Sequence, residues 1–459
     1  MISIISPADN RVVAERELLN ETQLQQLVTR AQAVQPQWQQ TAVAERAALC
    51  RKAVEHMLAD KQRLAREITL QMGRPIRYTD AEIDGLAERA RYMIEIAPEC
   101  LQATTLPSRN GTERFIRQVP LGLVLVIAPW NYPYLTAVNS VVPALMAGNC
   151  VLLKHSAQTL LCAEAFQRAF ELAGLPAGVL QYCHLDHDTT GWLARHPAIA
   201  LIVFTGSVPG GKAIEQACGG LFKTVALELG GKDPAYVRAD ADIAFTAAQL
   251  ADGAFFNSGQ SCCAVERIYV HKRIFSQFVD SFCTRVSDYR LGDPTDPATT
   301  LGPVVNTRAA NRVRRQLTQA TAQGATALID STRFAADQGK DQYLAPQVLI
   351  DVDHDMDVMR EETFGPLVGL MPVDTDHQAV TLMNDSQYGL TASVWTADKQ
   401  AAIMLGRQLH TGTVYMNRCD YLDPALAWTG VRQSGRGVTL SRLGYTQLTR
   451  PQSFYLQEY

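Results

Sequence analysis

Five short, continuous runs of apolar residues constrain the fold of this chain more than any other feature of its sequence. Each run is followed by a turn and then by a stretch with helical spacing. Strands that are apolar on both faces are typical of a parallel sheet covered by helices on both sides. We therefore predict a doubly wound α/β domain, with strands within residues 121–128, 150–153, 179–182, 199–204 and 224–227.

Helices are predicted before this sheet, and a second domain after it. Residues 20–104 carry apolar side chains at helical spacing. We expect them to form a packing layer with no further role. After residue 231 the alternation of helix and strand begins again, with helices at 243–256 and 274–289 and a strand at 267–270. This alternation predicts a second α/β domain.

Two further stretches, 114–119 and 451–459, resemble strands that belong to neither core. Arms that pair across subunits and edge strands within one chain explain them equally well.

Composition excludes several classes of partner. The net charge of −4 and the lack of a basic block argue against nucleic acid. The longest apolar runs fall far short of the roughly 18 residues of a membrane span, so we expect neither secretion nor membrane insertion. The ten cysteines lack the spacing of a disulfide framework or a zinc site, which favours the reducing cytoplasm and no bound metal.

Polar side chains follow the predicted strands closely. Asn131, Lys154, Ser207 and Glu228 each stand one to three residues after an apolar run. Ligands of such sheets bind just beyond the carboxyl ends of the strands, so we expect these groups to meet along one edge.

Two motifs in this region each allow two interpretations. Residues 206–212 come close to a P-loop, but Ala213 stands where a hydroxyl would hold Mg²⁺. The turn is therefore either a pyrophosphate site at a helix N-terminus or a plain tight turn. His184 and His187 resemble a metal pair, but no third ligand is identifiable, and a solvated loop before a helix is the interpretation we favour.

Asn131 and Glu228 are candidates for catalysis. Glu228 ends an apolar run, where loss of water would raise its pKa toward that of a general base. Alternatively, the backbone N–H groups of Gly230 and Gly231 satisfy this carboxylate. Asn131 lies between two prolines and presents an amide suited to an oxyanion, although a rigid turn is the simpler interpretation.

The third candidate is Cys262, the first of two adjacent cysteines. Gly259 and Gln260 before it suggest a polar, reachable site, which a nucleophilic thiol needs. Judged alone, a cysteine among small and apolar residues is more often part of a core.

Taken in order, these stretches resemble the aldehyde dehydrogenase superfamily over nearly the whole chain. The shared motifs are Pro-Trp-Asn-Tyr-Pro from residue 129, Lys154, Phe-Thr-Gly-Ser to 207, Leu-Glu-Leu-Gly-Gly-Lys to 232, Gly-Gln-Ser-Cys to 262, Glu-Glu-Thr-Phe-Gly-Pro over 361–366 and Ser-Gly-Arg-Gly over 434–437.

The resemblance implies a Rossmann-type cofactor domain, a second α/β catalytic domain and a bridging β-arm that builds homodimers or homotetramers. The cofactor domain would comprise residues 1–103 and 120–230, the catalytic domain 231–430, and the arm 104–119 and 440–459.

The resemblance also implies NAD(P)-dependent oxidation of an aldehyde to the carboxylic acid. Cys262 would attack the aldehyde, and Cys263 would only pack. The Asn131 side chain and the Cys262 backbone N–H would hold the oxyanion. After hydride transfer to the nicotinamide, Glu228 would activate the water that hydrolyses the thioester.

Cofactor contacts follow from the same resemblance. Glu362 would hold the nicotinamide ribose beside Phe364, Lys154 would reach the adenosine ribose, and Ser207 the pyrophosphate. Ala157 stands where many relatives carry a ribose-binding Glu, so NAD and NADP both stay open, with NAD favoured. The full set is Trp130, Lys154, Ser156, Gly206, Ser207, Gly211, Leu229, Glu362 and Phe364.

The sequence leaves two classes of aldehyde substrate open. Tyr132, Phe256, Tyr421 and Trp428 suggest an aromatic-walled tunnel for a medium aliphatic or aromatic aldehyde. Alternatively, Arg418 or Arg436 would anchor the carboxylate of a semialdehyde.

Other functions compete with aldehyde oxidation. A P-loop ATPase is disfavoured by Ala213. A coenzyme A-acylating enzyme would not need Glu228, and a non-catalytic relative would not need Cys262, Glu228 and Asn131 together.

Overall fold

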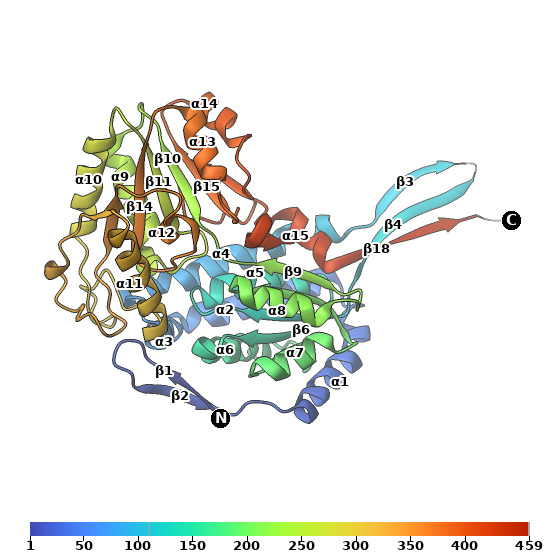
Figure 1. The fold of residues 1–459 in the computed structure, drawn as a ribbon. Coiled ribbons are helices and arrows are strands. Elements are labelled where there is room, and N and C mark those ends of the chain that lie inside the picture. Colours follow the sequence, from blue (N-terminus) through green and yellow to red (C-terminus); the bar gives the residue numbers. More distant parts are fainter. Residues whose placement is uncertain (110, 458–459) are drawn as a thin grey trace.

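The computed structural model describes residues 1–109 and 111–457. It consists of two α/β lobes and a β-arm that projects away from both (Figure 1). Apart from short pieces, each lobe is built on one mainly parallel sheet, as the continuous apolar runs predict.

The first lobe contains a six-stranded sheet in the order β17-β9-β8-β5-β6-β7. Pairing is parallel from β9 to β7, and every residue of β5 and β6 is buried, which explains why these strands are apolar on both faces. All five predicted strands are confirmed. The strands are β5 (Leu123–Ala128), β6 (Cys150–His155), β7 (Leu180–Tyr182), β8 (Ile199–Thr205), β9 (Thr224–Glu228) and β17 (Gly435–Arg436).

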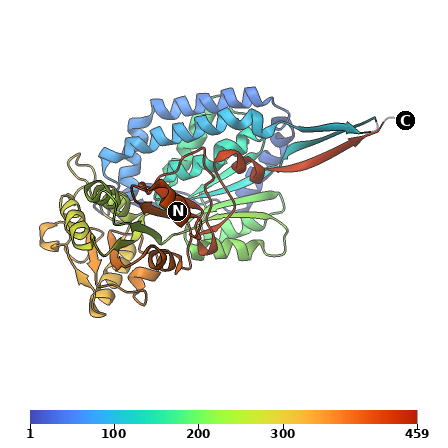
Figure 2. The ribbon, with the colours of Figure 1, turned by 90° about the horizontal axis from the view of Figure 1, so that it is seen from above.

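Helices cover both faces of this sheet. Seen from above, the long N-terminal helices lie on one side and the helices coloured green on the other (Figure 2). Gly73 ends α3 in a left-handed conformation with φ 86°. The helices are α1 (Glu21–Trp38), α2 (Val43–Ala59), α3 (Lys61–Met72), α4 (Ile76–Leu101), α5 (Pro133–Met146), η1 (Ala157–Thr159), α6 (Leu160–Leu172), α7 (His187–Arg195) and α8 (Val208–Cys218).

A small hairpin, β1 (Ile2–Ile5) with β2 (Val12–Arg16), precedes α1. The suggested histidine pair is split between two environments: His184 is 4% exposed, contrary to the solvated loop expected there, whereas His187 is exposed. His184 contacts Glu164 at 2.9 Å, His187 begins α7, and residues 1–109 and 111–457 hold no metal-binding cluster.

The second lobe contains a seven-stranded sheet in the order β12-β13-β14-β11-β10-β15-β16, parallel except for β12. The predicted strand at 267–270 and the helices on either side of it are confirmed. The strands are β10 (Asp233–Val237), β11 (Val265–His271), β12 (Thr326–Ala327), β13 (Gln347–Ile350), β14 (Leu367–Val373), β15 (Thr391–Trp395) and β16 (Thr413–Met416).

The remaining helices belong to this lobe or connect it to the arm. They are α9 (Ile243–Phe255), η2 (Phe256–Gly259), α10 (Phe275–Ser287), α11 (Thr307–Ala322), η3 (Ser331–Arg333), α12 (Asp357–Arg360), α13 (Asp376–Asn384), α14 (Lys399–Gly406), η4 (Arg432–Ser434) and α15 (Ser441–Leu448). No helix in the described part of the chain has the length and apolarity needed to span a bilayer.

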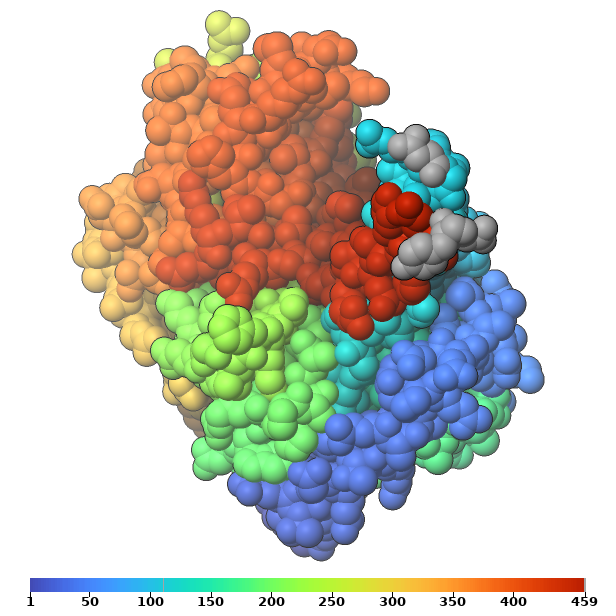
Figure 3. Space-filling view, turned by 90° about the vertical axis from the view of Figure 1, so that its right-hand side faces the viewer, coloured from blue at the N-terminus to red at the C-terminus, as the bar shows by residue number. Residues whose placement is uncertain are grey.

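The arm is a three-stranded antiparallel sheet in the order β18-β4-β3. Its strands are β3 (Thr104–Arg109), β4 (Thr112–Pro120) and β18 (Thr449–Leu456). The two strands that the sequence left unassigned therefore pair with each other, and the rings of Phe115 and Phe454 stack at 4.6 Å. The arm projects from the body in Figure 1, and in Figure 3 its cyan and red strands are seen end on, in front of the body. Residues 441–448, expected within the arm, form α15, which packs on α4 and α5.

One buried side chain fastens the arm to the first sheet. Asn149 accepts a hydrogen bond from Gly122 N at 2.9 Å and donates to the carbonyl of Leu448 at 2.9 Å. Gly122 immediately precedes β5 and Leu448 immediately precedes β18, so this amide joins the root of the arm to the sheet edge.

We predict that Asn149→Ala lowers the free energy of unfolding by about 3 kcal/mol, because it leaves a buried N–H and a buried carbonyl without partners. Urea unfolding followed by circular dichroism measures this loss. Asn306→Ala, which removes one exposed helix cap of α11, is the matched control and should cost only about 1 kcal/mol. An equal loss in both variants would contradict the bridging role of Asn149.

Candidate active site

A left-handed loop presents the two adjacent cysteines. Asn257, Ser258 and Gly259 have φ values of 53°, 58° and 70°, a conformation that non-glycine residues rarely adopt. The surrounding structure holds the loop in place, because the Ser258 hydroxyl donates to the carbonyl of Gly302 at 2.7 Å. The chain therefore turns abruptly after α9 and brings Cys262 to the start of the following strand.

Gln260 is buried and braces this loop, whereas the sequence suggested a polar, reachable site there. Its side chain accepts a hydrogen bond from Val305 N at 2.8 Å and donates to the carbonyl of Asn257 at 3.0 Å. Its backbone carbonyl accepts from Asn131 Nδ2 at 3.2 Å. Because an amide nitrogen carries two hydrogens, Asn131 keeps one N–H for another acceptor.

A buried ion pair from the N-terminal helices fixes Asn131. Arg74 Nη1 lies 2.5 Å from Glu82 Oε2, and both side chains are at most 1% exposed. Arg74 also donates to the backbone carbonyl of Asn131 and, at 3.2 Å, to Asn257 Oδ1. The N-terminal helices thus do more than pack, which corrects the expectation from the sequence.

The two cysteines differ in their surroundings. Cys262 is partly exposed, whereas Cys263 is 2% exposed and donates to Asp420 Oδ1 at 3.0 Å. Contact with Cys262 and burial raise the pKa of Cys263 well above its usual range, so this thiol stays protonated. Of the pair, only Cys262 has the accessibility that a nucleophile needs.

Glu228 is held by two hydroxyl groups. Thr205 donates to its Oε2 at 2.9 Å and Thr439 to its Oε1 at 2.5 Å. Burial raises the pKa of Glu228, and these two hydrogen bonds oppose the increase. The alternative in which Gly230 and Gly231 satisfy the carboxylate is wrong, because Gly231 N donates to Glu362 Oε1 at 3.1 Å. The Cys262 carbonyl packs against Gly231, only three residues beyond Glu228.

A second buried ion pair shapes the segment around Glu362. Lys232 Nζ lies 2.6 Å from Glu266 Oε2, and Glu266 accepts hydrogen bonds from Thr363 N and Phe364 N at 2.8 and 2.9 Å. Phe364 has φ 51° and its ring meets that of Trp130 edge-on at 5.5 Å. The predicted cofactor residues Trp130 and Phe364 therefore meet from two distant segments, and Glu362 lies two residues before Phe364.

The glycine turn at the start of α8 leaves backbone open at a helix N-terminus. Ser207 caps this helix by accepting from Gly210 N at 3.3 Å, and Pro209 lies in the first turn, where its missing N–H costs nothing. A side chain at Gly206 would meet the ring of Phe204, and one at Gly211 would meet Leu229. Close packing thus requires these glycines, and the turn also fits a pyrophosphate.

Lys154 also fits a nucleotide. Lys154 is the last residue but one of β6 and is 9% exposed. Its ammonium group has no hydrogen-bond partner within residues 1–109 and 111–457. Burial lowers the pKa of this ammonium group. Ser156, two residues on, caps η1. A buried cation without an acceptor suits ribose hydroxyls or a phosphate.

The residues predicted to line a substrate tunnel have neighbours that connect them to this site. Arg74 lies 4.4 Å from the ring centre of Tyr132, and Phe256 packs edge-on against Tyr78 at 5.2 Å. Trp428 exchanges two backbone hydrogen bonds of 2.9 Å with Thr439, the residue that holds Glu228.

Neither predicted carboxylate anchor is a free, buried cation. Arg418 is exposed and stacks on Tyr421 at 3.8 Å. Arg436 pairs with Glu215 at 2.7 Å, with 58% of its side chain exposed.

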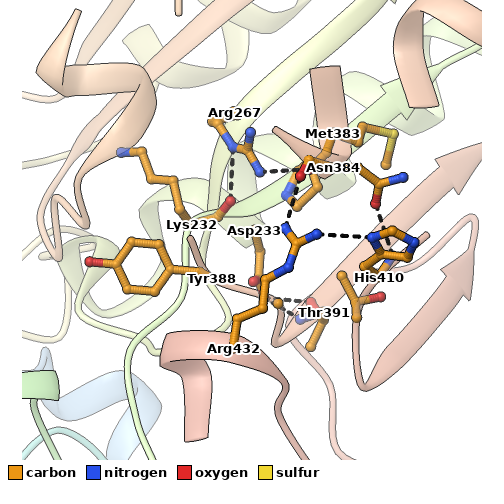
Figure 4. A pocket seen from close by; sticks show the side chains of 12 residues that line it. Lys232, Asp233, Arg267, Met383, Asn384, Tyr388, Thr391, His410 and Arg432 are labelled. Carbon is orange, nitrogen blue, oxygen red and sulfur yellow. Dashed lines mark hydrogen bonds between the residues drawn. The ribbon is translucent and has the colours of Figure 1, made fainter. Parts of the chain in front are cut away.

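A small, partly open polar cavity next to Lys232 is not part of this site. Its volume is about 10 Å³, enough for a single water. Figure 4 shows that its polar groups satisfy one another: Arg267 donates to the carbonyl of Lys232 at 2.9 Å, and Arg432 contacts His410 at 2.9 Å.

Sequence reasoning missed the positioning residues Arg74, Glu82, Glu266, Asp420 and Thr439. Each acts through a partner far away in the sequence, so no local pattern marks it. The only available signal was a charged residue at an otherwise apolar helical position, as at Glu82 beside Ile83 and Leu86.

Comparison with known proteins gives one consistent result. The profile of the aldehyde dehydrogenase family matches residues 1–454. A succinate-semialdehyde dehydrogenase (NADP+) of Deinococcus radiodurans is 34% identical over 445 residues, which cover 97% of this chain and 92% of that protein. A geranial dehydrogenase of Castellaniella defragrans is 34% identical over 397 residues, covering 86% of this chain and 82% of that protein.

A comparison with solved structures gives the same family. An indole-3-acetaldehyde dehydrogenase in complex with NAD+ superposes with a TM-score of 0.95 at 30% identity, covering 99% of this chain and 93% of that chain. The predicted fold class is thereby confirmed.

We predict that Glu362→Gln stabilises the unliganded protein at pH 8 by about 2 kcal/mol and has little effect near pH 4. Burial, together with the nearby Glu266, raises the pKa of Glu362 to about 7. The folded state therefore binds this proton more tightly than the unfolded state, and the contribution of Glu362 to stability falls as the pH rises from about 4.5 through 7.

Urea unfolding at a series of pH values tests this prediction. Glu361→Gln, at the exposed neighbouring position, is the control and should change stability little at any pH. A gain for Glu362→Gln that does not depend on pH would contradict the assignment.

Proposed function

This chain belongs to the aldehyde dehydrogenase family, and on that premise we propose that Cys262 is the nucleophile of its NAD(P)-dependent oxidation of an aldehyde to a carboxylic acid. One observation carries this proposal: a single accessible thiol stands on a braced loop, beside the amide of Asn131 and the strand end of Glu228. Acyl chemistry needs these three groups together.

The first bond forms between Cys262 Sγ and the aldehyde carbon. The carbonyl oxygen becomes an oxyanion, which the free N–H of Asn131 and the backbone N–H of Cys262 stabilise. Arg74 and Asn257 hold Asn131 through its backbone, so the donor is in place before the substrate arrives.

Bound NAD(P)+ supplies the hydride acceptor that turns the aldehyde carbon into an acyl group. We propose that Lys154, Ser156, the turn Gly206–Gly211, Leu229 and the group Trp130, Glu362 and Phe364 hold this cofactor. The unpartnered ammonium of Lys154 and the open helix N-terminus at Ser207 support this assignment. Relatives that use NADP+ or NAD+ accord with the lack of a carboxylate at Ala157.

Glu228 acts as the base for hydrolysis of the thioester. It removes a proton from water, the water oxygen attacks the acyl carbon, and the bond to Cys262 Sγ breaks. Each carboxylate oxygen accepts one hydrogen bond from a threonine hydroxyl and keeps a second lone pair that can accept a hydrogen bond from water. The overall change converts aldehyde, water and NAD(P)+ into acid, NAD(P)H and a proton.

The domain assignment follows from this chemistry. Residues 1–103 and 120–230 carry most of the groups proposed for the cofactor, and 231–430 carry Cys262 together with Glu362 and Phe364. β17, within residues 435–436, pairs with the strand of Glu228 and so returns the chain to the first sheet. Cysteines without disulfide partners in the described residues suit a reducing compartment such as the cytoplasm.

Substituting the two cysteines separately tests the nucleophile. We expect Cys262→Ala to abolish NAD(P)H formation with every aldehyde, whereas Cys263→Ala retains turnover. An aldehyde panel crossed with NAD+ and NADP+, followed by absorption of NAD(P)H, measures both. Turnover by Cys262→Ala would refute the assignment.

Glu228→Gln should keep a rapid first turnover but slow the steady rate by about 100-fold or more, because only thioester hydrolysis needs the base. Rapid-mixing kinetics separate the two phases. If the steady rate survives, another group activates the water.

The arm supports assembly into homodimers or homotetramers. Tyr455 and Leu456 on β18 are 66% and 45% exposed, and the arm projects from the body with no other element packed around it in the described residues (Figure 1). Apolar side chains on such a strand become buried when it meets a second subunit.

We expect the unmodified chain to be a dimer or tetramer and Tyr455→Asp/Leu456→Asp to shift it to monomers, because a buried, unpaired charge opposes association. Analytical ultracentrifugation measures the change. Leu172→Asp, at a position 60% exposed on the body, is the control and should leave assembly intact. A monomeric unmodified chain would contradict the proposal.

A further inference from the structure

Asp186 is an exposed carboxylate just beyond the carboxyl end of the strand β7. It caps α7, and its Oδ1 accepts hydrogen bonds from the hydroxyl of Thr189 at 2.7 Å and from Thr189 N at 2.8 Å. Both bonds lower the pKa of Asp186, and the bond from the hydroxyl contributes most. The side chain is therefore ionised at neutral pH. Its Oδ2 has no hydrogen-bond partner in the described residues.

The loop that carries Asp186 is fixed before and after this residue. Cys183 N donates to the carbonyl of Leu153 at 2.9 Å, which continues the pairing of β6 with β7. The ring of the buried His184 contacts Glu164 at 2.9 Å. Together with the cap on α7, these contacts hold Asp186 beside the end of β6.

Lys154, near the end of β6, faces the same loop. Burial lowers the pKa of its ammonium group, and the charges of Cys183 and Asp186 oppose that change. Lys154 and Asp186 form no direct ion pair, because no carboxylate oxygen of residues 1–109 and 111–457 lies within 4.0 Å of the lysine nitrogen. The ammonium is not fully buried, so a ligand can reach it. The two charges thus stand near each other without contact.

This pair of charges suits a neutral diol better than a phosphate. An ammonium group only donates hydrogen bonds, and an ionised carboxylate only accepts them. A sugar hydroxyl does both, so a ribose can accept from Lys154 and donate to the free Oδ2 of Asp186. A phosphate ester on that hydroxyl has lost the hydrogen to donate, and it brings negative charge toward Asp186.

We propose that Asp186 selects NAD+ over NADP+ by accepting a hydrogen bond from the adenosine ribose and repelling a phosphate on its 2′-hydroxyl. This role rests on the proposed function, in which Lys154 reaches the same ribose. Asp186 supplies, from beyond the neighbouring strand, the carboxylate that Ala157 lacks. The preference is opposite to that named for the Deinococcus radiodurans relative, which is an NADP+ enzyme.

One substitution separates the charge of Asp186 from its role as a helix cap. Asn and Asp are equally good caps, and the side-chain oxygen of Asn can accept the same two hydrogen bonds from Thr189. Asp186→Asn therefore removes the negative charge and keeps the start of α7. A residue that only capped the helix would show no effect on the choice of cofactor.

Calorimetric titration at pH 8 tests the inference without turnover. We expect the unmodified protein to bind NAD+ about 10-fold more tightly than NADP+, and Asp186→Asn to bind both about equally, mainly through tighter binding of NADP+. AMP and its 2′-phosphate differ only at the ribose and should show the same change. Added salt should narrow the preference of the unmodified protein, because Asp186 is exposed.

Asp188→Asn is the matched control. Asp188 is an exposed carboxylate in the first turn of α7, but it is not among the electrostatic neighbours of Lys154. We expect this variant to change the ratio of the two affinities by less than about twofold.

Three outcomes would overturn the inference: equal affinities in the unmodified protein, a preference that Asp186→Asn retains, or an equal loss of both dinucleotides in that variant. In each of these cases the enzyme still binds a dinucleotide and oxidises aldehydes. Failure of the proposed function is distinct, because then neither dinucleotide binds and no aldehyde yields NAD(P)H, and the inference fails with it.

Discussion

The buried pair of Arg74 and Glu82 is the interaction on which the geometry of the active site depends. Arg74 reaches the carbonyl of Asn131 and the side chain of Asn257, so one guanidinium joins the loop before α5 to the loop before Cys262. Glu82 accepts from Tyr134 N at 2.8 Å and so also holds the first turn of α5. Breaking such a pair from one side costs roughly 3–5 kcal/mol, because it leaves a buried charge.

A buried ion pair in the second lobe plays an equivalent role. Lys232 and Glu266 place Thr363 and Phe364 by backbone hydrogen bonds, and Gly231 adds one to Glu362. Groups proposed to touch substrate and cofactor thus lie on loops, while buried ion pairs beneath them supply rigidity. This arrangement lets irregular, left-handed backbone persist at Asn257 and Phe364.

The fold and the location of the site were accessible from the sequence, because both depend on local patterns. Continuous apolar runs identified the buried parallel strands, and the polar residues after them predict the edge where the proposed ligands bind. The packing partners were not accessible. Gln260 carries no local mark that separates a brace from a ligand contact, since its role depends on Val305, which lies 45 residues away.

Thr439 holds Glu228 with its hydroxyl and Trp428 with its backbone. One residue therefore couples Trp428, which we propose lines the substrate tunnel, to the resting position of Glu228, which we propose as the base. A substitution at Trp428 that shifts Thr439 would also move the carboxylate of Glu228. With these proposed roles, a change of substrate range at Trp428 brings a change in the rate of hydrolysis with it.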